Sequence, residues 1–131
     1  MNKRSIAFVI IVAIMLAIGY FYDPLKDDPK YKEMQQLYAT LPVYPNSHES
    51  SDFGGSHGSF AYYGKYYEAD LNYEELKRFY LEKLPSLGWE FDTEEEFSMS
   101  WFGKNEGKEL NFLRGEYKVS VAYVTKEASA G

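Results

Sequence analysis

The residue types best suited to chemistry gather in one short segment. His48 and His57 enclose a stretch that also holds Glu49 and Asp52. Two imidazoles and two carboxylates are ligands that zinc accepts, provided that rigid elements hold them and neighbouring groups orient them. Two serine–glycine clusters fill most of the rest of the segment up to Ser59, which favours a flexible, solvated loop. We therefore predict no metal site and no bound cofactor.

Carboxylates offer a second route to chemistry. The run from Asp92 to Glu96 is acidic, but a calcium loop spaces its ligands around an obligatory glycine, so a solvated hairpin turn is expected here. Glu68 and Asp70 could act as an acid and a base, yet nothing in the sequence indicates a cleft around them. With no cysteine in the chain, thiolate chemistry and disulfides are excluded. We predict no catalytic residue and no enzymatic activity.

Four tyrosines in one predicted strand, from Phe60 to Ala69, are the most unusual pattern. Neighbouring strand residues point to opposite faces, unless a bulge at Gly64 changes the phase. Each face therefore receives two tyrosines, and only one face can meet a helix. Packing inside the protein and a partner-binding surface both remain open for the residues concerned, which are Tyr62, Tyr63, Tyr66 and Tyr67.

The charge balance excludes one class of partner. The chain of 131 residues carries a formal net charge of −6, with 20 acidic against 14 basic residues. An acidic surface is repelled by phosphate backbones, so nucleic-acid binding is not expected.

The N-terminus predicts a membrane anchor. Residues 6–22 carry no charge, and as a helix they would be about 25 Å long, at the short end for a bilayer span. Aromatic residues 20–22 follow the apolar run as interfacial anchors do. A cleaved signal peptide ending near residues 17–19 is the alternative. Because Lys3 and Arg4 favour the cytoplasmic side, we predict a single-pass protein of the cytoplasmic membrane, in contact with lipid through residues 6–22, with its C-terminal domain outside.

The remaining chain predicts a small domain of class α+β. Apolar residues recur every three or four positions from Asn72 to Leu84, which indicates a helix capped by Asn72 and ending before Pro85. Alternating segments follow it, with a hairpin turn expected at residues 104–107 and a last hairpin of Leu110–Leu113 and Tyr117–Thr125 around residues 114–116. The predicted fold is an N-terminal transmembrane helix, then one helix packed on an antiparallel sheet of four to five strands in the order β-α-β-β-β-β.

The domain organisation follows from the same pattern. It consists of an anchor (1–22), a linker with a short amphipathic helix at Lys30–Leu41 (23–41), the α+β domain (42–125) and a frayed tail (126–131).

Several motifs of the domain resemble a small domain found in bacterial envelope proteins. The motifs are residues 42–47 (PVYPNS), Phe79-Tyr80 and Leu87-Gly88-Trp89, followed by a phenylalanine-rich meander. The resemblance covers about residues 41–124 and implies a β-α-β-meander fold and an envelope location in lipoproteins or membrane-anchored chains of unknown function. It implies no catalytic residues, and this chain lacks the lipidated cysteine of the lipoprotein members.

The leading hypothesis is thus a membrane-tethered, extracytoplasmic module for protein interaction or assembly, without catalysis, whose partner is an envelope protein. Glycan binding through the tyrosine strand is the alternative. A hydrolase that uses carboxylates is the third hypothesis.

Overall fold

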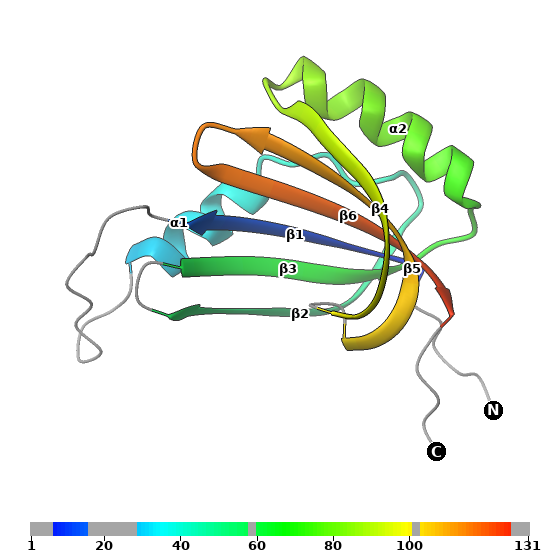
Figure 1. The fold of residues 1–131 in the computed structure, drawn as a ribbon, viewed down its shortest axis with the longest axis horizontal. Coiled ribbons are helices and arrows are strands. Elements are labelled where there is room, and N and C mark those ends of the chain that lie inside the picture. The colour runs from blue at the N-terminus through cyan, green and yellow to red at the C-terminus, as the bar shows by residue number, and fades with distance from the viewer. Residues whose placement is uncertain (1–6, 16–28, 58–59, 101–102, 127–131) are drawn as a thin grey trace.

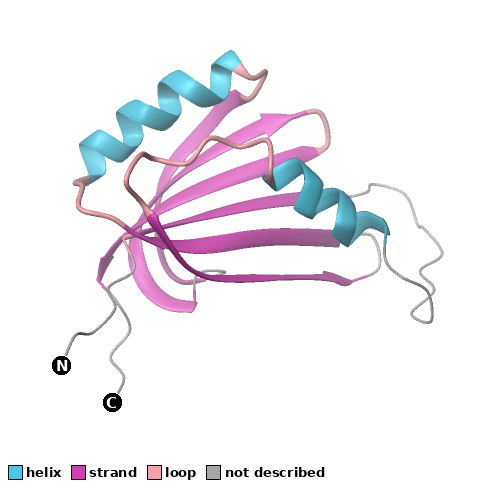
Figure 2. Ribbon diagram, turned by 180° about the vertical axis from the view of Figure 1, so that it is seen from behind, coloured by secondary structure: helices cyan, strands magenta, loops and turns pink. Residues whose placement is uncertain are grey.

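A computed structural model describes residues 7–15, 29–57, 60–100 and 103–126, which form two layers. These residues contain six strands and two helices, in the order β1 (Phe8–Met15), α1 (Pro29–Tyr38), β2 (His48–His57), β3 (Phe60–Glu68), α2 (Tyr73–Ser86), β4 (Glu90–Ser100), β5 (Gly103–Arg114) and β6 (Tyr117–Lys126). The strands pair antiparallel in one sheet with the order β2-β3-β1-β6-β5-β4. Both helices lie on the same face of this sheet (Figures 1 and 2).

The N-terminal strand β1 is an inner strand, between β3 and β6. Its Ile11, for example, lies opposite Gly64 of β3 and Ser120 of β6. Alternate side chains enter two cores: four face the helices (Phe8, Ile10, Val12 and Ile14), and two face the other way (Val9 and Ile11). A strand buried on both faces needs an apolar residue at every position, and β-branched residues suit it best. This explains the absence of charge in this run.

The predicted transmembrane helix is therefore wrong. Residues 8–15, which we expected in the span, form β1, and the rest of the apolar run lies outside the described residues. Among the residues that the structure describes, no helix is both long and apolar enough to cross a membrane. The prediction of a signal-anchored, single-pass protein of the cytoplasmic membrane, with its C-terminal domain outside, is overturned with it.

The main core lies between the sheet and the two helices. Met34 and Tyr38 of α1 pack on the inner strands, and α2 contributes Leu76, Tyr80 and Leu84. The Asn72 side chain accepts a hydrogen bond from the Glu75 N–H at 2.9 Å, which confirms the predicted helix start.

The end of α2 differs slightly from expectation. The helix continues to Ser86, and Pro85 is accommodated in its last turn. Gly88, with φ of 94°, then reverses the chain, and its N–H donates to the Pro85 carbonyl.

The predicted sheet of four to five strands is also wrong, because the sheet has six. Besides β1, sequence reasoning missed β2, which we expected to be a flexible loop. Its serines and glycines carry no apolar alternation, but pairing with β3 from His48 to His57 holds it extended. Phe53 is the one large apolar residue of β2. Its ring lies against Gly64 of β3, and a side chain at position 64 would collide with this ring.

The acidic run from residue 92 to 96 lies inside β4 and is not a turn. Likewise, the expected turn at residues 104–107 lies inside β5. The predicted hairpin of β5 and β6 is confirmed, with Gly115 at its turn. Most of the predicted frayed tail, residues 127–131, lies outside the described residues.

The outer hairpin of β4 and β5 curls strongly out of the plane of the flatter strands β2, β3 and β1 (Figure 1). The curl needs Gly107, where any side chain would collide with the backbone carbonyl of Tyr123. The register of β5 against β6 shifts at the same point. Phe97 of β4 contacts Val9, Ile11, Ala122 and Val124 in a second, smaller core on the face without helices.

Candidate functional site

The four tyrosines of β3 lie on opposite faces of the sheet, two on each. Tyr63 and Tyr67 point toward the helices and are 7% and 4% exposed. Tyr62 and Tyr66 are half-buried on the other face. The register of β3 with both neighbours runs without a shift through Gly64, so the bulge considered there is absent and the alternation holds. Partner binding through any of the four tyrosines stays a prediction.

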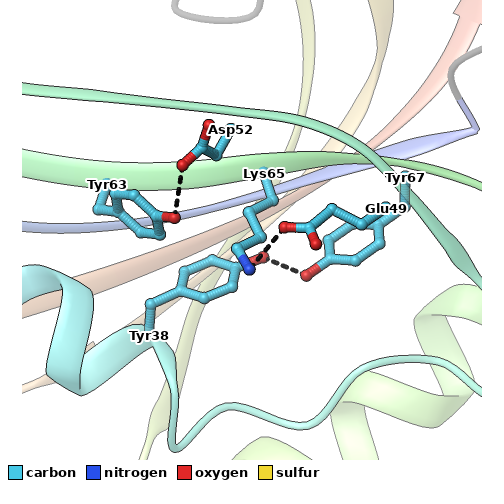
Figure 3. A network of polar contacts seen from close by, with 6 residues as sticks. All are labelled: Tyr38, Glu49, Asp52, Tyr63, Lys65 and Tyr67. Atoms are coloured by element: carbon cyan, nitrogen blue, oxygen red, sulfur yellow. Dashed lines mark hydrogen bonds and ion pairs between the residues drawn. The ribbon is translucent and has the colours of Figure 1, made fainter.

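The helix-facing pair belongs to a buried network (Figure 3). The hydroxyls of Tyr67 and Tyr38 are 2.7 Å apart and share a hydrogen bond, and the Tyr67 ring stacks on Phe8 with centroids 4.9 Å apart. Burial raises the pKa of both phenols above the usual value. Neutral, hydrogen-bonded and enclosed, these two tyrosines stabilise the packing of α1 on the sheet.

Charged groups at the rim of this network bind the edge strand β2 to β3. The Lys65 ammonium is 2.6 Å from a Glu49 carboxylate oxygen, and this hydrogen bond raises the pKa of Lys65. Tyr63 donates a hydrogen bond of 2.8 Å to Asp52, and burial raises the pKa of Tyr63 (Figure 3). The two carboxylates that we weighed as zinc ligands are thus engaged in contacts between β2 and β3.

The two histidines lie at opposite ends of β2. At about 3.3 Å per residue, nine steps of a strand place their backbones roughly 30 Å apart, too far to share one ion. Among the described residues, no three side chains of His, Asp or Glu come together as a possible metal site.

The acidic residues of β4 do not gather in one place, because neighbouring residues of a strand point to opposite faces of the sheet. Glu94 faces α2, where it accepts hydrogen bonds from Tyr73 and from Lys77, the latter at 3.0 Å. The bond from Tyr73 is the main reason that the pKa of Glu94 is lowered. Glu95 faces the opposite side. The pair Glu68 and Asp70 lies at the end of β3 and just beyond it.

The face of the sheet opposite α1 and α2, which we call the helix-free face, has an aromatic half on β2 and β3. The Phe53 ring lies 4.9 Å from Tyr66 and 6.3 Å from Tyr62, measured between centroids. The three rings are half-buried and pack against the smaller core. The Tyr66 hydroxyl has no hydrogen-bond partner among the residues that the structure describes.

The other half of the helix-free face is polar, and Asn111 organises it. Asn111 is 1% exposed and is the one buried polar residue within the described ranges. Its Nδ2 donates to Thr93 Oγ1 at 3.0 Å and to Glu95 Oε2 at 3.3 Å, and its Oδ1 accepts from Ser120 Oγ at 2.6 Å. A buried amide that is satisfied on both sides fixes its neighbours in one arrangement.

Glu109 lies beside this network, directly opposite Glu95 on the neighbouring strand. Burial raises the pKa of Glu109, the Glu95 carboxylate adds to the rise, and Lys118 opposes it. The polar half therefore contains acceptors and donors close together.

The two halves face the same side because β1 and β6 connect them in register. Phe53, Gly64, Ile11, Ser120, Asn111 and Thr93 are successive cross-strand partners from β2 to β4. A parallel row contains Tyr66, Val9, Ala122, Glu109 and Glu95. The residues between the rings and the carboxylates, which include Val9, Ile11 and Ala122, are buried with Phe97 of β4 in the smaller core, so this core separates the two halves.

Sequence reasoning identified the tyrosines but missed the polar half and Phe53. One signal was available, because Asn111 interrupts the apolar run from Leu110 to Leu113, and asparagine is disfavoured inside strands. Thr93 and Ser120 carry no such signal. Only the pairing of β4, β5 and β6 brings them to Asn111.

Comparison with known proteins adds no further constraint, since no protein-family model, curated protein or solved structure matches this chain. The resemblance to an envelope domain stays a prediction.

Proposed function

We propose that the protein is a non-catalytic interaction module that holds its partner on the helix-free face. The observation that supports this most is the placement of Tyr66: its ring is half-buried on the side opposite both helices, with a hydroxyl that no described residue engages. Tyr67, the next residue, is enclosed in the main core.

Packing inside the protein accounts fully for one of the two tyrosine pairs and only in part for the other. Tyr63 and Tyr67 contribute buried area and hydrogen bonds to the fold. Tyr62 and Tyr66 form, with Phe53, an aromatic layer that remains accessible. Accessible aromatic side chains with few rotatable bonds are the residues that most often dominate binding energy.

The polar half supports the same proposal. Holding Asn111 in the interior with three hydrogen bonds orients Thr93, Glu95 and Ser120 before any partner arrives. Binding groups that are already oriented lose less entropy when a complex forms. A protein and a glycan are both compatible with an aromatic half beside a polar half.

Site-specific photocrosslinking tests the proposal for either class of partner. The full chain is produced in its native cells with benzoylphenylalanine at position 66, irradiated, and analysed by mass spectrometry. The matched control carries the same group at Phe91, which is 46% exposed but packs beside Phe112 on the helix-bearing face. We expect adducts at position 66 well above those at position 91.

Equal adduct yields at the two positions would contradict the proposal, because contact would then follow exposure alone. The same conclusion follows if position 66 yields no adduct while the variant is folded by circular dichroism.

A further inference from the structure

We propose that two copies of this chain join edge to edge through β2, so that one sheet continues across a two-fold axis at Gly54. Within the described ranges the outer side of β2 pairs with no other strand, since β2 ends the sheet. The inference goes beyond the proposed function and does not depend on it. Three properties of β2 support it: its regular edge, its neutralised charge and its complementarity to itself.

The edge of β2 offers unpaired backbone groups along a regular stretch. After the register shift between Glu49 and Ser51, the pairing with β3 continues without a break from Ser51 to His57. At about 3.3 Å per residue this stretch is roughly 20 Å long, and its outward N–H and C=O groups can pair with a further strand. Figure 1 shows β2 extended beside β3, away from the curled hairpin.

The two acidic residues of β2 do not block this edge, because side chains of β3 engage both. The Glu49 carboxylate lies 2.6 Å from the Lys65 ammonium, and Asp52 accepts a hydrogen bond of 2.8 Å from Tyr63. Free charges on an edge strand usually prevent further pairing. The other residues from position 50 to 56 are serines, glycines and one phenylalanine, which carry no charge.

The opposite edge of the sheet has the reverse character. Strand β4 carries exposed acidic side chains, namely Glu90, Asp92, Glu94, Glu95 and Glu96. Pairing of β4 with a second β4, or with β2, would bring like charges together, which disfavours both arrangements. Between the two described edges, pairing of β2 with β2 alone avoids this repulsion. It therefore produces a closed dimer and not a filament.

The strand is complementary to itself in one register. Antiparallel pairing about a two-fold axis matches residues at equal distances from the axis, and Gly54 is the midpoint of the regular stretch. Phe53 then lies opposite Gly55 of the second copy, so the one bulky side chain meets the smallest residue. Asp52 lies opposite Ser56 of the second copy, whose hydroxyl can donate to the carboxylate. An axis at Asp52 would instead oppose two carboxylates.

The helix layer adds a contact at the axis. A side chain at Gly54 would come within 2.6 Å of Cε1 of Tyr31, so the ring of this α1 residue lies over the glycine. Adjacent strands are about 4.8 Å apart, which brings the two Tyr31 rings together at the axis. On the helix-free face the aromatic halves of the two chains become neighbours, so the dimer presents the candidate binding surface twice.

Sedimentation velocity of the full chain measures the self-association. An interface of one strand pair is small, so we expect a dimer with a Kd of about 10–100 μM. Isotope-filtered nuclear Overhauser effects, in a mixture of labelled and unlabelled chains, should connect Gly54 of one copy with Gly54 of the other. A chain that is still monomeric at about 1 mM would overturn the inference and leave the edge to a strand of another protein.

Variants of Ser56 test the register with opposite expected signs. Ser56→Asp faces Asp52 of the second copy at two symmetric positions and should weaken the dimer about fivefold, whereas Ser56→Lys should tighten it about fivefold. A variant that merely loses its fold cannot tighten the dimer. The matched controls, Gln36→Asp and Gln36→Lys, change the net charge equally at an exposed position of α1 and should alter the Kd less than about twofold.

The inference is wrong if the two Ser56 variants dimerise like the Gln36 controls, or if a dimer forms without contacts between the two Gly54 residues. The proposed function is decided separately by the crosslinks from position 66. An adduct there with a molecule other than this chain supports the interaction module even when the chain is monomeric.

Discussion

Tyr66 and Tyr67 are neighbours in sequence but have different roles in the structure. Tyr67 is 4% exposed, stacks on Phe8 and shares a hydrogen bond with Tyr38. Tyr66 is half-buried on the other face, next to Phe53. Truncation of Tyr67 to alanine should lower the free energy of unfolding by about 3–5 kcal/mol, the usual cost of removing a buried aromatic ring. Truncation of Tyr66 should cost about 1 kcal/mol, mainly the loss of one ring pair.

Urea unfolding of the two single variants measures this difference. A similar loss of stability in both would mean that Tyr66 is a core residue and that the aromatic half is not a binding surface.

The pH dependence of stability should report on Glu109. Burial and Glu95 raise the pKa of this carboxyl in the folded state, despite Lys118. The folded protein then holds the proton more tightly than the unfolded chain, whose glutamate has a pKa of about 4.3. The resulting stabilisation is complete below that value and is lost as the pH rises through the raised folded pKa. Glutamine has no proton to lose.

We therefore expect the stability of Glu109→Gln, relative to the natural protein, to increase as the pH rises from about 4 toward neutrality. Unfolding by urea at several pH values measures it. A difference that stays constant, or that falls with rising pH, would contradict this environment of Glu109.

At the level of elements, the curl of the β4–β5 hairpin depends on Gly107. Alanine there would place a methyl group into the backbone of β6, and the collision is with a carbonyl that cannot move aside easily. We expect Gly107→Ala to destabilise the protein by about 3 kcal/mol or more. Gly55→Ala is the control: its methyl group would meet only the outer end of the Tyr62 ring, no closer than 3.4 Å, and should be nearly neutral. If thermal unfolding shows the two variants to be equally stable, the hairpin does not curl as described.

Elements with a strong local signal could be predicted from the sequence. Helix α2 combines a periodic apolar stripe with Asn72 as its cap, and the β5–β6 hairpin combines alternation with a glycine turn. The ends of α2 and β6 lie within two residues of the expected ones, whereas β5 begins at Gly103, seven residues before the expected start at Leu110. Local chemistry determines these elements, so no knowledge of the rest of the chain is required.

The strands β1 and β2 were not predicted, for opposite reasons. The β1 run is so apolar that a bilayer and a protein interior both suit it, and its β-branched residues were the signal for a strand. The β2 run is so poor in apolar residues that only its pairing with β3 makes it a strand. In both cases distant segments decide the structure. The polar half of the candidate site is hidden for the same reason, because its residues come from three strands.

At the scale of the whole molecule, the arrangement of the sheet and of its two cores depends on the position of β1. It separates β3 from β6, contributes to both cores, and places the rings of β2 and β3 on the same face as the polar network of β4, β5 and β6. Without β1 between them, the two halves of the candidate site would not belong to the same sheet.

The place of β1 between β3 and β6 is therefore the central claim. It is tested most directly by measuring nuclear Overhauser effects between backbone protons of β1 and those of its neighbouring strands, in the full chain. The structure predicts contacts from Val9 to both Tyr66 and Ala122, and from Ile11 to both Gly64 and Ser120. Contacts between residues three apart within positions 8–15, as in a helix, together with none to β3 or β6, would contradict it.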